Sequence, residues 1–135
     1  MDIFKTFDVS ASALVAQKLR MQTISSNLAN INTTRTPEGG PYRRRDVVFE
    51  TLLMDEEGLL SGVRVKDVRV DQRPPRVVYD PDHPDADENG YVRLPNINLV
   101  EEMVNMMLAT RAYEANVNSF NITKGMILKA LELGK

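Results

Sequence analysis

The segment from Asp80 to Gly90 holds the densest group of side chains that could do chemistry. It reads Asp-Pro-Asp-His-Pro-Asp-Ala-Asp-Glu-Asn-Gly. Four of its residues match the opening of an EF-hand calcium loop: Asp85, Asp87, Asn89 and Gly90. The twelfth position of such a loop needs a bidentate glutamate, and here it is Asn96. We therefore expect no metal site, but a solvated loop shaped by prolines and by side-chain hydrogen bonds to the backbone.

His83 is the only histidine in the chain, and acidic residues lie on both sides of it. A histidine in this setting could act as a general base or as a metal ligand. No serine, cysteine or second histidine stands near it in the sequence to complete a nucleophilic triad or a zinc cluster. We therefore expect no catalytic residue, no cofactor and no enzymatic activity.

The basic run Arg43-Arg44-Arg45 could contact phosphate, but a run this short is a weak signal. The chain has 17 Lys and Arg against 19 Asp and Glu, a formal net charge of -2. This balance predicts neither nucleic-acid binding nor a polybasic membrane surface. We favour a surface strand edge guarded by charge as the role of the run.

The overall composition limits the class of protein further. The 135 residues suit one folding or assembly unit, and 42% of them are hydrophobic. The absence of cysteine excludes disulfides and thiolate metal sites. We expect no cleaved signal peptide, because the first residues lack a basic start followed by an apolar run. We also expect no membrane insertion, because no apolar stretch approaches the length of a bilayer span.

The distribution of proline and glycine divides the chain into three regions. All seven prolines and most of the seven glycines lie in residues 33–95. Residues 1–32 and 96–135 contain no proline, which predicts a long helix in each. The first of these regions repeats an apolar residue every seven positions, at Phe7, Leu14, Met21 and Leu28. Such a narrow stripe is typical of a helix that packs along its length against another helix.

The last region carries a longer repeat, with positions alternately four and three residues apart. These positions are Leu99, Met103, Met106, Thr110, Tyr113, Val117, Phe120, Lys124, Ile127 and Leu131. The pattern fits either a coiled coil or the buried face of an amphipathic core helix. Helices this long span about 40 and 55 Å, at about 1.5 Å per residue. The middle region is too small to cover them, so their stripes must pack on each other or on other chains.

The middle region shows the short alternating patterns of strands. Strands are predicted over residues 46–53, 63–70 and 76–79, with a slip of alternation at Lys66 and Asp67 that indicates either a bulge or a twist. Asn89-Gly90 is a favoured hairpin turn. The predicted fold class is α+β, with long N- and C-terminal helices packed as a coiled-coil-like pair and a small β-hairpin-rich middle.

Two sequence strings resemble known signatures. The first helix ends in Ser-Ser-Asn-Leu-Ala-Asn over residues 25–30, and residues 102–116 read Glu-Met-Val-Asn-Met, then Ala-Thr-Arg-Ala-Tyr-Glu-Ala-Asn. Both resemble the terminal signatures of the flagellar rod, hook and filament-junction proteins. The middle, with Asp80-Pro81, Gly90-Tyr91-Val92 and Pro95-Asn96, is similar to the proximal-rod members of the flagellar basal-body rod family.

This resemblance implies a structural subunit of the proximal rod, part of the drive shaft that transmits torque from motor to hook. Residues 1–32 and 96–135 would form the inner core of a helical tube enclosing the export channel, with residues 33–95 outside. The implied partners are copies of itself, other rod proteins, the MS-ring and export-gate junction proteins on the proximal side, and the flagellar export apparatus. The implied location is the rod in the periplasm, reached without a cleaved signal peptide.

The residues expected to carry assembly are those of the stripes and signatures. They are Phe7, Leu14, Met21, Asn27, Leu28, Asn30, Met103, Met106, Arg111, Tyr113, Asn116, Val117, Phe120, Ile127 and Leu131. Asn27 and Asn30 are expected to satisfy the last carbonyls of the first helix. The alternative function is a cytoplasmic coiled-coil adaptor or an export-associated interaction protein. That alternative accounts for the stripes but not for the asparagine-rich helix end.

Overall fold

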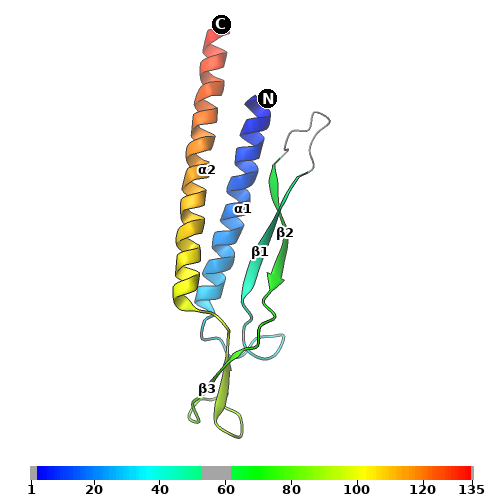
Figure 1. Ribbon diagram of the computed structural model, residues 1–135, viewed down its shortest axis with the longest axis vertical. Coiled ribbons are helices and arrows are strands. Elements are labelled where there is room, and N and C mark those ends of the chain that lie inside the picture. The colour runs from blue at the N-terminus through cyan, green and yellow to red at the C-terminus, as the bar shows by residue number, and fades with distance from the viewer. Residues whose placement is uncertain (1–2, 53–61, 135) are drawn as a thin grey trace.

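The computed structural model describes residues 3–52 and 62–134. The elements, in chain order, are α1 (Ile3–Ala29), β1 (Arg45–Thr51), β2 (Val63–Val70), β3 (Arg76–Tyr79), β4 (Tyr91–Leu94) and α2 (Leu99–Leu133). The molecule is elongated, with the two helices antiparallel and side by side (Figure 1). The fold is therefore α+β, with terminal helices and two small antiparallel hairpins, as the sequence predicted.

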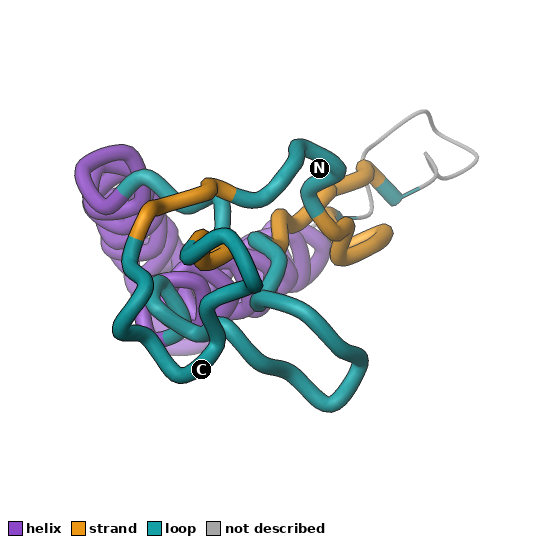
Figure 2. The backbone as a smooth tube through the Cα atoms, turned by 90° about the horizontal axis from the view of Figure 1, so that it is seen from below, coloured by secondary structure: helices purple, strands orange, loops and turns teal. Residues whose placement is uncertain are grey.

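The first helix occupies the centre of the upper body. α1 packs along α2 on one side and against β1 and β2 on the other (Figure 1). Contacts on two sides bury Ala16 and Ile24 of α1 almost completely. Seen from below in Figure 2, the loops of the β3–β4 end lie in front of the helices. The core is thus a thin layer between α1 and its two neighbours rather than a single compact centre.

The seam between the helices follows a line that hydrophobic spacing alone did not identify. The most buried positions of α2 are Glu102, Ala109 and Thr123. Half-buried Met106, Tyr113, Phe120 and Ile127 lie beside them on the same face. This second line belongs to the predicted repeat, whereas predicted Leu99, Met103 and Leu131 are exposed. The helices meet on the side of Ala109 because its small side chain lets the two helix backbones approach closely. The larger residues Leu99, Met103 and Leu131 therefore remain outside the seam.

The β1–β2 hairpin carries the predicted bulge. Its register pairs Val48 with Asp67 but the next residue, Phe49, with Val65. Lys66 is therefore the extra residue of β2, and the slip of alternation seen in the sequence is confirmed as a bulge. β1 is shorter than the predicted strand over residues 46–53, which ends outside the described residues.

The β3–β4 hairpin projects from the end opposite both termini (Figure 1). β3 coincides with the predicted strand over residues 76–79 and pairs Tyr79 with Tyr91 of β4. The two tyrosine rings meet edge to face, with centroids 5.3 Å apart. Gly90 precedes β4 with φ of +85°, in the region that favours glycine. The side chain of Val92 anchors the hairpin and is 2% exposed.

We predict that Gly90→Ala destabilises the protein more than Gly40→Ala. Both glycines have positive φ, so each substitution costs about 1–2 kcal/mol of backbone strain. Only at Gly90 would the added Cβ also lie 2.9 Å from the Tyr79 ring and 3.1 Å from Pro81, whereas at Gly40 it meets open space. Urea unfolding followed by circular dichroism measures both losses. Equal losses in the two variants would contradict the close packing around Gly90.

Candidate functional site

A buried asparagine joins the end of α1 to the start of β1. Asn27 is 0% exposed. Its Nδ2 donates a hydrogen bond to the Arg45 carbonyl oxygen at 2.8 Å, and its Oδ1 accepts one from the Arg45 backbone N–H at 3.0 Å. The prediction that Asn27 satisfies helix carbonyls is therefore wrong, because its side chain faces β1. For Asn30 it is confirmed, since its Nδ2 donates to the Ser26 carbonyl oxygen at 2.8 Å.

Tyr42 completes this junction. Its hydroxyl donates to Asn27 Oδ1 at 3.0 Å and lies 3.2 Å from the Ser26 hydroxyl. The Arg45 guanidinium carbon lies 5.7 Å from the centroid of the Tyr42 ring, in cation–π range. Both side-chain polar atoms of Asn27 thus bind the backbone of Arg45, and its oxygen also binds Tyr42. These bonds hold the end of α1 against the start of β1.

A second junction ties β1 to the start of α2. The Arg44 side chain is 12% exposed, and its Nε donates to Oε1 of Glu102, whose side chain is 1% exposed. Asp46 and Asp71 lie 3.8 and 3.9 Å from Arg44 Nη1. Burial by itself lowers the pKa of Arg44, but the hydrogen bond and charge of Glu102, with the two aspartates, raise it overall. The prediction that the arginine run guards a surface strand edge is therefore wrong for Arg44, whose side chain is mostly buried and forms an ion pair inside the protein.

The acidic loop is held by its own chain. Asp85 accepts a hydrogen bond from the Thr34 hydroxyl at 2.5 Å and forms an ion pair with Arg35. Asp87 Oδ1 accepts from the backbone N–H groups of Asn89 and Tyr91, both at 2.9 Å. These bonds confirm the predicted turn stabilised by side chains. Within residues 3–52 and 62–134, no three His, Asp or Glu side chains are grouped to hold a metal ion.

Two interactions of this loop set its electrostatics. The hydrogen bond from Thr34 is the largest cause that lowers the pKa of Asp85; burial opposes it, and the hydrogen bond and charge of Arg35 add to the lowering. The His83 Nδ1 atom accepts the backbone N–H of Asp85 at 3.0 Å. His83 therefore shapes the loop locally and is aimed at its own backbone.

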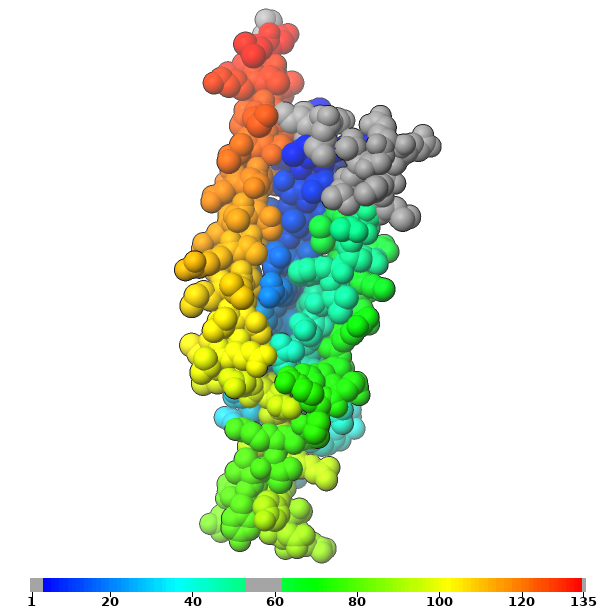
Figure 3. All heavy atoms as spheres, in the orientation of Figure 1, coloured from blue at the N-terminus to red at the C-terminus, as the bar shows by residue number. Residues whose placement is uncertain are grey.

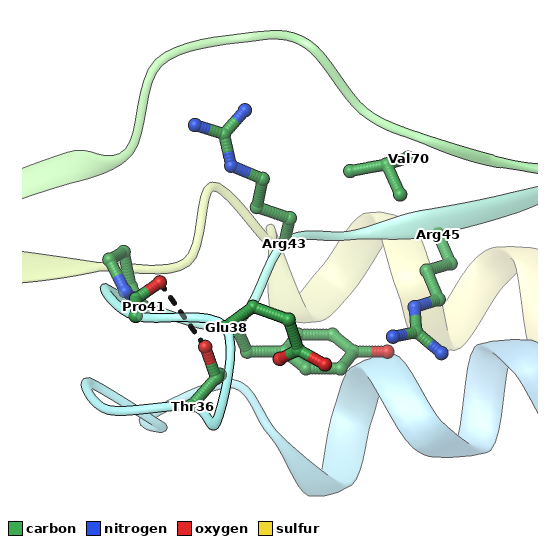
Figure 4. Close-up of a pocket in the computed structure, with 8 residues that line it drawn as sticks. Thr36, Glu38, Pro41, Arg43, Arg45 and Val70 are labelled. Carbon is green, nitrogen blue, oxygen red and sulfur yellow. Dashed lines mark hydrogen bonds between the residues drawn. The ribbon is translucent and has the colours of Figure 1, made fainter.

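An open cavity of about 400 Å³ lies beside β1 and includes Thr36, Glu38, Arg43 and Arg45 in its lining. Figure 4 shows the Arg43 and Arg45 side chains directed to different sides of the cavity. The Thr36 hydroxyl donates to the carbonyl oxygens of Gly39 and Gly40, so it is engaged in the turn. The cavity thus offers positive charge but no nucleophile paired with a base.

The predicted assembly residues lie in three settings within one chain. Asn27 is buried, and Met103, Arg111 and Leu131 are exposed. The others are half-buried: Phe7, Leu14, Met21, Leu28, Asn30, Met106, Tyr113, Asn116, Val117, Phe120 and Ile127. Phe7 and Phe120 stack with centroids 4.2 Å apart, and Met21, Met106 and Tyr113 share an open groove along the seam.

Sequence reasoning missed Tyr42, Arg44 and Glu102 as functional residues. Glu102 belongs to the C-terminal signature, but a charged residue is invisible to a search for apolar periodicity. The sequence nevertheless contained a clue: Glu102 stands seven residues before Ala109, so both residues lie on the same face of the helix. For Arg44 the clue was the alternation of side chains in an extended chain. In a run of three arginines, this alternation places the side chain of the middle one on the side opposite those of its two neighbours.

None of the described helices combines the length and apolar character needed to cross a bilayer. Comparison with known families gives two matches. The family described as "Flagella basal body rod protein" matches residues 7–35. The family described as "Flagellar basal body rod FlgEFG protein C-terminal" matches residues 88–133. The two matches cover most of α1 and all of α2.

Curated relatives match the whole chain. The chain is 44% identical over 135 residues to the "Flagellar basal-body rod protein FlgC" of Salmonella typhimurium, covering 100% of both. It is 43% identical over 150 residues to the protein of that name from Bacillus subtilis, again covering 100% of both. With the Borreliella burgdorferi protein of that name it shares 43% identity over 149 residues, covering 98% of each.

We predict that Arg44→Ala lowers the free energy of unfolding by about 3–5 kcal/mol, the cost of removing one partner of a buried ion pair. Glu102→Ala should cost less, because Asp46 and Asp71 still face Arg44, whereas Arg44 is the residue that forms the ion pair with Glu102. Urea unfolding measures both. Exposed Arg43→Ala is the matched control and should change stability by less than about 0.5 kcal/mol. A loss at Arg43 equal to that at Arg44 would contradict the buried pair.

We also predict a pH dependence that involves Asp85. Its folded-state pKa is lowered, so its contribution to stability is present above the ordinary value of 3.8 and is lost as pH falls through the lower folded-state value. Asp85→Asn should therefore show a smaller acid-induced fall in the urea midpoint than the wild type. Thr34→Val, which removes the main cause of the shift, should act in the same direction. An unchanged acid profile in both variants would rule out this contribution.

Proposed function

Because the chain belongs to the family of flagellar basal-body rod proteins FlgC, we propose that it is a structural subunit of the flagellar rod. The observation that carries this proposal is the exposed apolar surface near both ends of the C-terminal helix, over residues 99–108 and 122–133. α2 packs on α1 along its seam, and apolar side chains outside that seam indicate a further buried setting. In a rod subunit that setting would be supplied by the helices of neighbouring subunits.

The extent of the exposed apolar surface supports assembly. The large apolar residues of α2 that are exposed are Leu99, Val100, Met103, Val104, Met107, Leu108, Ile122, Met126, Leu128, Leu131 and Leu133. Soluble monomers rarely expose contiguous apolar patches of more than a few hundred Å². Burial of one such side chain contributes about 1.5–3 kcal/mol, so association of many copies is strongly favoured. The four methionines among them and beside them suit neighbours that differ in shape, because methionine adapts to irregular surfaces.

In the rod, α1 and α2 would form the inner wall of a helical tube around the export channel, with the hairpins outside. The buried junctions at Asn27 and Arg44 support a role in torque transmission, because they hold both helices rigidly to β1. We place the subunit in the periplasmic part of the basal body. Its proposed partners are copies of itself, other rod proteins, the MS-ring and export-gate junction proteins, and the export apparatus.

We propose no catalytic role and no cofactor. The acidic loop directs Asp85 toward Thr34 and Arg35, and Asp87 toward backbone N–H groups, which supports a structural function for its carboxylates. A cytoplasmic adaptor would share the helical stripes, but similarity along the whole chain to rod proteins favours the rod.

The decisive test is complementation of a flagellated bacterium that lacks its own rod protein of this family. The wild-type chain should restore swimming. Leu28→Asp should be produced and exported yet give no rod, because an unpaired charge at a packed helix face cannot be solvated. His83→Ala should swim normally, because the hydrogen bonds of His83 lie within its own loop. A motile Leu28→Asp strain beside a non-motile His83→Ala strain would overturn the packing function and point to a site in the acidic loop.

A further inference from the structure

The C-terminal helix extends beyond the helix that it packs against. The stacked rings of Phe7 and Phe120 fix the antiparallel alignment of α1 and α2. By this alignment the start of α1 at Ile3 lies near the level of Lys124. α2 continues to Leu133, which is about 13 Å further at about 1.5 Å per residue. Figures 1 and 3 show this end of α2 standing beyond the rest of the described chain.

This overhang, residues 126–133, is mostly apolar; Ile127 is half-buried and the other seven residues are exposed. Met126, Leu128, Leu131 and Leu133 are between 53% and 85% exposed. Leu128 and Leu131 lie one turn apart, and Glu132 is one turn from Leu128 on the same side. The overhang therefore presents two leucines and one carboxylate on a single face, and no described residue of its own chain packs over that face.

A matching groove lies at the opposite end of the helix pair. Met21 of α1 and Met106 and Tyr113 of α2 form its apolar floor, in an open hollow of about 420 Å³. Lys18, Gln22 and Ser25 complete the lining. Lys18 is exposed and forms no ion pair within the part of the chain that the structure describes. The groove thus offers two methionines and a tyrosine beside one unpaired cation.

We propose that the overhang of one copy docks in this seam groove of the next copy, head to tail. Leu128 and Leu131 pack against Met21, Met106 and Tyr113, and Glu132 meets Lys18. The proposal rests on the rod function proposed above and names one contact within it. The same pairing at every step gives a heterologous contact that propagates in one direction, as an open helical assembly requires.

One chain cannot make this contact with itself. Groove and overhang both include residues of α2, which is a single unbroken helix from Leu99 to Leu133. The roughly 20 residues between them hold the two sites about 30 Å apart, at about 1.5 Å per residue. The two surfaces also match in kind, apolar with apolar and cation with carboxylate. A second copy is therefore the occupant that satisfies both ends at once.

The absence of cysteine from the chain allows a direct test by crosslinking. Lys18→Cys combined with Glu132→Cys places one thiol at each end of the proposed contact while keeping both leucines. The matched control combines Lys18→Cys with Ala130→Cys, which lies on the opposite side of the overhang at almost the same height. Both pairs are expressed in the complemented strain, and isolated basal bodies are treated with a short bis-maleimide crosslinker.

The expected result is a ladder of dimers, trimers and higher multiples of this chain, about tenfold stronger than in the control, since docking raises the effective concentration of the two thiols. Monomer alone, a band that stops at the dimer, equal ladders in both pairs, or linkage only to a different protein would each overturn the proposal. If the doubly substituted cysteine variant does not assemble, a charge-reversal experiment tests the contact instead. Lys18→Glu and Glu132→Lys should each reduce the diameter of the swimming ring in soft agar. The double variant, which restores opposite charges, should restore the diameter. Equal rings in single and double variants refute the contact. Failure of the wild-type chain to restore swimming would instead refute the rod function.

Discussion

The arrangement of this protein depends on the polar junction at the base of its helix pair. Three elements meet there: the end of α1, the start of β1 and the start of α2. Asn27 holds β1 through both backbone groups of Arg45, and the preceding arginine, Arg44, holds α2 through Glu102. Neither contact can be exchanged for water, because Asn27 and Glu102 are buried. The hairpin, the helix seam and the connecting loops all take their positions from these two links.

The junction also explains why an elongated chain with so little core has one defined shape. A single layer of half-buried side chains along the seam leaves the rotation of each helix weakly determined. Buried hydrogen bonds and ion pairs are directional, so they fix that rotation where apolar contacts alone would permit several. Glu102 Oε2 at the junction is buried without a hydrogen-bond partner among the described residues, so this directionality has some cost in solvation.

Local features of the fold were predictable from the sequence because each has a local cause. The strand at residues 76–79 follows two prolines, the bulge at Lys66 breaks a two-residue alternation, and both helices lie in proline-free regions. The seam was only partly predictable, since Ala109 and Glu102 contribute by size and charge rather than by hydrophobicity. Asn27 was assigned the wrong partner because helix ends ordinarily use such side chains as caps. Its real partner lies eighteen residues away and depends on the tertiary fold.

The uneven distribution of polar links has a mechanical consequence. The buried hydrogen bonds and ion pairs that join α1, β1 and α2 gather at one end of the helix pair, at Asn27 and at Arg44 with Glu102. Further along the pair, α1 meets α2 through the stacked rings of Phe7 and Phe120. Ring contacts tolerate small changes in helix spacing better than directional hydrogen bonds do. A change in the angle between the two helices would therefore pivot about the end that holds Asn27 and Arg44.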